Sequence, residues 1–193
     1  MNHNSVTLAV DNAAEGLNIR AFLQQAVDHY PRLVAFSFTA LLPCHETMTD
    51  KQALITRFHT EVWQRIGEYS WQRQQSHQSS PPTILRWIWG AVDTAECNMV
   101  LLMNFDTLGA ISNVQLIENA QHAISEIIQD VWLTVMDTDR CGVMNITPII
   151  VNRTGKGAFS APFNKLQTQV QAMCQPVTTA KTGGWTNTLT HSR

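Results

Sequence analysis

The sequence carries little charge and no long hydrophobic run. Only 15% of its 193 residues are Asp, Glu, Lys or Arg, whereas about 25% is usual in globular proteins. No run of about 18 apolar residues occurs, so the sequence predicts no membrane-spanning helix. The opening segment, MNHNSVTLAVDN, lacks the basic and continuously apolar regions of a secretory signal. These absences predict a cytoplasmic protein with no membrane partner.

Residues that build the common metal and catalytic sites are scattered along the chain. The seven histidines never lie two or four positions apart, which removes the usual spacings of a zinc site. The segment NRTGKGAFS around Lys156 lacks the spacing of a phosphate-binding loop, and no Gly-x-Ser-x-Gly motif occurs. We therefore predict no metal, no cofactor and no catalytic residues. The four cysteines form no CxxC pair, and reduced thiols fit a cytoplasmic protein better than two disulfides.

Acidic residues are absent from the last quarter of the chain. From Arg140 onward there are six Lys and Arg and no Asp or Glu. Residues 1–139 therefore hold seven basic and fifteen acidic residues, a net charge of −8. Two interpretations stay open: the basic quarter is a face for an anionic partner such as nucleic acid, or it is a solvated tail that balances an acidic body.

The hydrophobic content, 44%, is enough for one well-buried core in a chain of this length. We divide the chain into a flexible leader (1–15), an α+β domain (16–160) and a basic C-terminal extension (161–193) packed on or trailing from that domain. Apolar side chains at helical spacing predict three helices, at Leu17–Tyr30, Asp50–Gln75 and Asn113–Met136. Thr47 or Thr49 is the expected cap of the second helix.

Four apolar segments of strand length complete the prediction. They are residues 32–42, Ile84–Val92, Cys97–Phe105 and Val143–Asn152. The resulting order, β, α, β, β, α, β, is that of the ferredoxin-like (split βαβ) plan, with a four-stranded antiparallel sheet and both long helices on one face. The hairpin made by the second and third strands has no ladder of charges, which favours the middle of the sheet. Pro148 places the last strand near an edge.

Strand alternation assigns side chains to faces of this sheet. Cys97 and Met99 share one face, and Asn98 lies on the other. A thiolate and a thioether suit copper(I), but core packing is the more ordinary role of such residues in a central strand. Trp87, Trp89 and Trp132 are also expected in the core. His59 and His122, on the two long helices, are expected at its boundary.

From Leu33 onward the chain resembles the YagK/YfjJ C-terminal domain family of replication-initiator-like proteins from filamentous phages and prophages. The resemblance rests on segments that follow one another in the same order. They are LVAFSFTALLP, LRWIWGA, CNMVLLMN, IIQDVWLTVM, RCGVMNITPIIVNR and TTAKTGGWTNTLTHSR.

Members of that family look like HUH endonucleases, in which a His-hydrophobic-His pair holds a divalent metal and a tyrosine attacks a DNA phosphate. This chain departs from the pattern at every matched position. The positions are Ser37, Thr39, Val92, Cys97, Met99 and Ala172. No tyrosine follows Tyr69, so the nucleophile is missing from the later part of the chain. The resemblance thus implies a pseudoenzyme of phage or prophage origin that acts by binding.

Two functions follow as hypotheses. In the first, the protein binds single-stranded or hairpin DNA, with basic side chains on the phosphates and Trp185 as a stacking platform. The basic side chains are Arg86, Arg153, Lys156, Lys181 and Arg193. In the alternative, the protein is an interaction module that inhibits or regulates a protein complex of the host or of a competing element. The net charge of −8 on residues 1–139 favours this alternative, because an acidic surface repels DNA.

Overall fold

The computed structural model of the chain describes residues 15–109, 114–137, 142–154, 159–173 and 177–183. Within these residues the chain forms an α+β fold with one antiparallel five-stranded sheet, whose strand order is β4-β1-β3-β2-β5. The strands are β1 Arg32–Leu41, β2 Leu85–Trp89, β3 Glu96–Asn104, β4 Val143–Asn152 and β5 Thr178–Thr182. The helices are α1 Glu15–His29, α2 Met48–Gln75, α3 Val114–Met136, α4 Ser160–Gln171 and the 3₁₀-helix η1 Phe105–Leu108.

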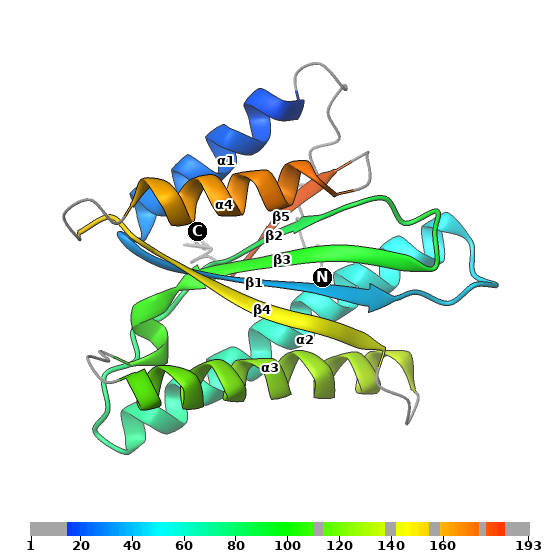
Figure 1. Ribbon diagram of the computed structural model, residues 1–193. Coiled ribbons are helices and arrows are strands. Elements are labelled where there is room, and N and C mark those ends of the chain that lie inside the picture. Colours follow the sequence, from blue (N-terminus) through cyan, green and yellow to red (C-terminus); the bar gives the residue numbers. More distant parts are fainter. Residues whose placement is uncertain (1–14, 110–113, 138–141, 155–158, 174–176, 184–193) are drawn as a thin grey trace, which may run out of the picture.

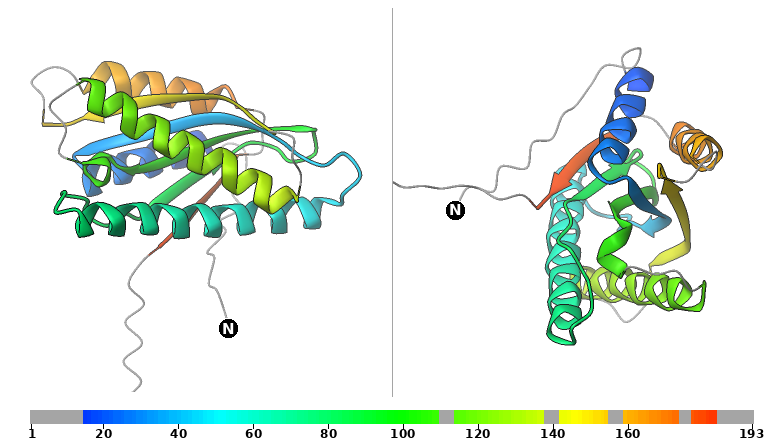
Figure 2. Two further views of the ribbon diagram at one scale, coloured as in Figure 1. Left: turned by 90° about the horizontal axis from the view of Figure 1, so that it is seen from below. Right: turned by 90° about the vertical axis from the view of Figure 1, so that its left-hand side faces the viewer.

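Two helices cover each face of the sheet. Figures 1 and 2 show α2 and α3 on one side and α1 and α4 on the other. Along β1, Phe36 and Phe38 enter the core under α2 and α3, whereas Leu33 and Ala35 enter the core under α1 and α4. Both faces are therefore apolar where helices cover them, which explains why the central strands lack the alternation of a half-exposed sheet.

The predicted order β, α, β, β, α, β is confirmed by β1, α2, β2, β3, α3 and β4. The prediction of four strands was incomplete. Residues 161–193, predicted as an extension, contribute most of α4 and all of β5, and β5 pairs with β2. The segment TTAKT has three threonines, which favour strands, but only one apolar residue, so it lacks the apolar alternation by which the other strands were predicted. It forms a strand by pairing with the edge of β2.

The predicted hairpin lies inside the sheet, as expected, and the two edges are β4 and β5. Along the edge strand β4, the pairing with β1 is interrupted by a register shift between Ser37 and Thr39. Pro148 lies in the same strand, where a missing backbone donor is tolerated. Both features protect an exposed edge from pairing with other chains.

Local signals set the start of α2. The Thr47 side chain accepts a hydrogen bond from the Asp50 backbone, and the Asp50 carboxylate accepts one from the Thr47 backbone. This reciprocal pair is a capping box, and it identifies Thr47 rather than Thr49 as the cap. None of the described helices is both long enough and apolar enough to cross a membrane.

Aromatic residues fill the centre of the core under α2 and α3. Phe58 of α2 contacts Trp87, Trp132 and Phe38, with ring centroids 5.0 to 6.2 Å apart. Trp87, Trp89 and Trp132 are buried, as predicted. The boundary position predicted for His59 was wrong: the side chain is 4% exposed and stacks on Trp87 with a centroid distance of 4.0 Å.

Candidate functional site

The six positions that the sequence resemblance predicted to match an HUH active site do not meet on one face of the sheet. Ser37 and Thr39 lie on the face under α1 and α4, where Thr39 donates a hydrogen bond to the Asn98 side chain at 2.9 Å. Cys97 and Met99 point to the opposite face and lie in the core under α2 and α3. Val92 follows β2 and is also in that core, and Ala172 caps the end of α4.

The sulfur ligands predicted as an alternative for copper are core residues. Cys97 and Met99 are both 0% exposed. Among the described residues, no group of three or more His, Cys, Asp or Glu is placed to hold a metal ion.

Of the predicted nucleic-acid contacts, three lie in the described part of the chain and three do not. Lys156, Trp185 and Arg193 are outside the described residues. Arg153 follows β4 and forms an ion pair with Asp28 of α1 at 2.5 Å. Arg86 and Lys181 stand opposite each other on the paired strands β2 and β5.

Helix α1 brings two more polar side chains to this cation pair. The guanidinium of Arg86 donates to the Gln25 side chain at 3.3 Å and to Nδ1 of His29 at 3.0 Å. The ammonium of Lys181 donates to the same Gln25 oxygen at 2.6 Å. We call Gln25, His29, Arg86 and Lys181 the cationic cluster. Sequence reasoning missed Gln25 and His29, because only the packing of α1 on β2 and β5 brings them to the strands.

The cluster combines a buried cation with a surface cation. Arg86 is 3% exposed, which its prediction as a surface contact did not anticipate, whereas Lys181, Gln25 and His29 are exposed. Because a guanidinium only donates, Nδ1 of His29 is the acceptor, and we assign the ring proton to Nε2. The cluster thus offers donors from Lys181 and His29 at the surface, with the charge of Arg86 beneath them.

The positive charges of the cluster repel one another. Burial lowers the pKa of Arg86, and burial together with the nearby Arg86 lowers the pKa of Lys181. Burial, Arg86 and Lys181 lower the pKa of His29, in that order of importance. Each of these shifts disfavours the cationic form, so a bound negative charge would relieve all three.

No carboxylate compensates the cluster within the described part of the chain. The ion pairs found there join Arg32 to Asp106, His122 to Glu126 and Arg153 to Asp28. In addition, Nε of Arg86 is buried without a hydrogen-bond partner. Buried cations are ordinarily paired, and like charges placed opposite each other destabilise a sheet. A phosphate or a carboxylate would have the charge and the hydrogen-bond acceptors that match this arrangement.

Comparisons with known proteins give a family for the chain. Residues 6–147 match the family described as Uncharacterised conserved protein UCP030791. The chain belongs to this family. The match runs from before α1 into β4, so it includes Gln25, His29 and Arg86, whereas Lys181 lies beyond it. No curated protein and no solved structure matches the chain at a significant level.

Proposed function

We propose that this member of the UCP030791 family binds nucleic acid, with a backbone phosphate held by the cationic cluster. One observation carries the proposal: Arg86 and Lys181 face each other across β2 and β5, and no ion pair among the described residues joins either of them to a carboxylate. A cation pair of this kind is costly unless an anion binds, and phosphate is the anion that DNA and RNA present repeatedly. Lys181 and His29 would donate to the phosphate oxygens, and Arg86 would add its charge from beneath.

The sheet supports a finer proposal about ancestry. The order β, α, β, β, α, β and the pairing of β1 between β3 and β4 fit a ferredoxin-like plan to which β5 has been added at one edge. We propose, on this plan and on the sequence resemblance, a replication-initiator-like protein of phage or prophage origin that binds without cutting. The absence of tyrosine after Tyr69 supports binding without transesterification.

A salt series tests the binding proposal. Labelled single-stranded, hairpin and duplex DNA would be titrated with the full chain at several salt concentrations, with and without Mg²⁺ or Mn²⁺. Binding should weaken steeply as salt rises, and the DNA should stay intact. Lys181→Gln should reduce the slope of log K against log salt by about 0.7 to 0.9, the contribution of one phosphate contact.

Arg65→Gln is the matched control, because Arg65 is exposed on α2, which covers the opposite face of the sheet. Its salt slope should equal that of the wild type. Absence of binding to every DNA at low salt would refute the proposal and favour the protein-interaction alternative. An unchanged slope in Lys181→Gln would also refute it, since the cluster would then not contact phosphate.

A further inference from the structure

A single acceptor atom lies between the two cations of the cationic cluster. The side-chain oxygen of Gln25, on α1, accepts a hydrogen bond from Nη1 of Arg86 at 3.3 Å and another from Nζ of Lys181 at 2.6 Å. Because guanidinium and ammonium groups only donate, the amide must turn its oxygen, and not its nitrogen, toward them. The oxygen of Gln25 therefore marks the point at which donors from β2 and β5 converge.

Position 25 holds an amide where a carboxylate of the same size would complete two ion pairs. A glutamate there would place a full negative charge between Arg86 and Lys181. The amide oxygen carries only a partial charge, and the pKa of Lys181 is lowered by burial and by Arg86 even with this oxygen in place. Gln25 thus holds the two cations by hydrogen bonds without neutralising them.

Arg86 has further contacts that would keep it in position if Gln25 moved away. Its Nη2 donates to Nδ1 of His29 at 3.0 Å, and the side chain is buried. The ring of Phe22, three residues before Gln25 on α1, has its centre 6.0 Å from both the guanidinium carbon of Arg86 and the ammonium of Lys181. The face of an aromatic ring attracts cations. Gln25, by contrast, is exposed, so its side chain can turn into water without unpacking the core.

We propose that Gln25 is a displaceable stand-in for the phosphate: one phosphate oxygen takes the place of the Gln25 oxygen and accepts from both Arg86 and Lys181, while the amide turns out into water. This displacement rests on the proposed function, because Gln25 belongs to the same cluster. It makes Arg86 a donor to the phosphate as well as a charge beneath it. The hydrogen bonds of Gln25 must break before the phosphate binds, so the free protein competes with its own ligand.

Two substitutions at position 25 separate this role from that of a direct phosphate contact. Gln25→Ala removes the competing oxygen and should tighten binding about two- to tenfold, because the hydrogen bonds that the phosphate has to replace are already gone. Gln25→Glu supplies the missing carboxylate and should weaken binding at least about tenfold. A side chain that itself held the phosphate would give weaker binding in both variants.

The test uses two probes on the full chain. Affinity for labelled single-stranded DNA is measured at one low salt concentration, and the rise in Tm caused by inorganic phosphate is measured by thermal denaturation. This rise should be largest in Gln25→Ala, intermediate in the wild type and smallest in Gln25→Glu. Each rise is taken against the same protein without phosphate, so any change of stability caused by the substitution itself cancels.

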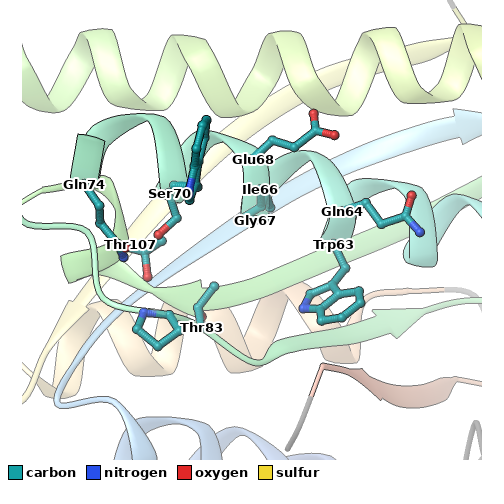
Figure 3. Close-up of a pocket in the computed structure, with 11 residues that line it drawn as sticks. Trp63, Gln64, Ile66, Gly67, Glu68, Ser70, Gln74, Thr83 and Thr107 are labelled. Carbon is teal, nitrogen blue, oxygen red and sulfur yellow. The ribbon is translucent and has the colours of Figure 1, made fainter. Parts of the chain in front are cut away.

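Gln64→Glu is the matched control, since it makes the same change of charge on α2. Gln64 is exposed and lines a groove of that helix together with Trp63 and Glu68 (Figure 3). Helix α2 covers the face of the sheet opposite the cationic cluster. Gln64→Glu should therefore bind DNA and respond to phosphate almost as the wild type does. A loss of affinity equal to that of Gln25→Glu would show that only net charge matters, and would overturn the displacement.

The two probes also distinguish failure of the displacement from failure of nucleic-acid binding. DNA affinity that is unchanged or lower in Gln25→Ala would overturn the displacement and leave nucleic-acid binding standing. The expected order with phosphate, without binding to any DNA, would support the displacement and refute the proposed function. A rise in Tm with phosphate that is equal in all the proteins would indicate an adventitious ion only, and would overturn the displacement as well.

A nuclear magnetic resonance spectrum of the wild type reports the movement of the amide directly. The side-chain NH₂ signal of Gln25, assigned by comparison with the spectrum of Gln25→Glu, should shift as inorganic phosphate is added, because the amide leaves the two cations for water. The signals of Gln64 should stay unchanged. A Gln25 signal that does not move while phosphate raises the Tm would show that the amide stays in place, and would contradict the displacement.

Discussion

Replacing Gly67 with alanine should stabilise the folded protein. The position is inside α2, and the new methyl group would lie in open space. Alanine is favoured over glycine in a helix interior by about 0.5 to 1 kcal/mol, mainly because glycine loses more backbone freedom on folding. For a domain of this size, that corresponds to a rise in Tm of about 1 to 4 °C. Thermal and urea denaturation of the variant and the wild type would measure it.

Gly142→Ala should instead destabilise the folded protein. A Cβ added there would lie 2.7 Å from the indole nitrogen of Trp132, whose side chain is 1% exposed and fixed in the core. Something must shift, and overpacking of this kind costs about 1 to 3 kcal/mol. Stabilisation by Gly142→Ala, or destabilisation by Gly67→Ala, would refute the reasoning from local space that separates the two glycines.

Two further substitutions test the start of α2 and its buried histidine. Thr47→Ala should lower the free energy of unfolding in urea by about 1 kcal/mol, because the cap to Asp50 is lost, whereas Thr49→Ala, beyond the cap, should have little effect. Burial lowers the pKa of His59 from 6.5 to about 3, so folded His59 stays neutral where the unfolded chain is protonated. Stability should therefore fall as pH drops below about 6.5, by about 1.4 kcal/mol per unit, until the folded pKa is reached. His59→Leu should flatten this dependence, measured by urea denaturation between pH 7 and 5; parallel curves for both proteins would contradict it.

Helices and strands with strong periodicity were predictable from the sequence. Phe58, Val62 and Ile66 repeat at the spacing of one helix face, and all three are buried under the sheet. The predicted bounds of β4, Val143–Asn152, are those of the structure. By contrast, β5 has almost no apolar signal, and its partner β2 lies about 90 residues earlier in the chain. Pairing with β2, rather than an apolar pattern of its own, makes this segment a strand, so the nearby sequence does not predict it.

The residues of the candidate site were also predicted only in part from the sequence. Arg86 and Lys181 were predicted as contacts for an anion, but as separate surface cations rather than as opposed neighbours. Gln25 and His29 had no motif that could have identified them.

The sequence by itself determined the α+β class, the order of the elements from β1 to β4, and the absence of tyrosine after Tyr69, since these depend on periodicity and residue type. Tertiary structure alone decided that Thr178–Thr182 adds a fifth strand to the sheet, that His59 is a core residue, and that Arg86 and Lys181 face each other with no ion pair to a carboxylate among the described residues. The physical reason is the distance along the chain over which each interaction acts. Backbone preference and amphipathicity act over a few residues, whereas burial and charge pairing are set by segments that meet only after folding.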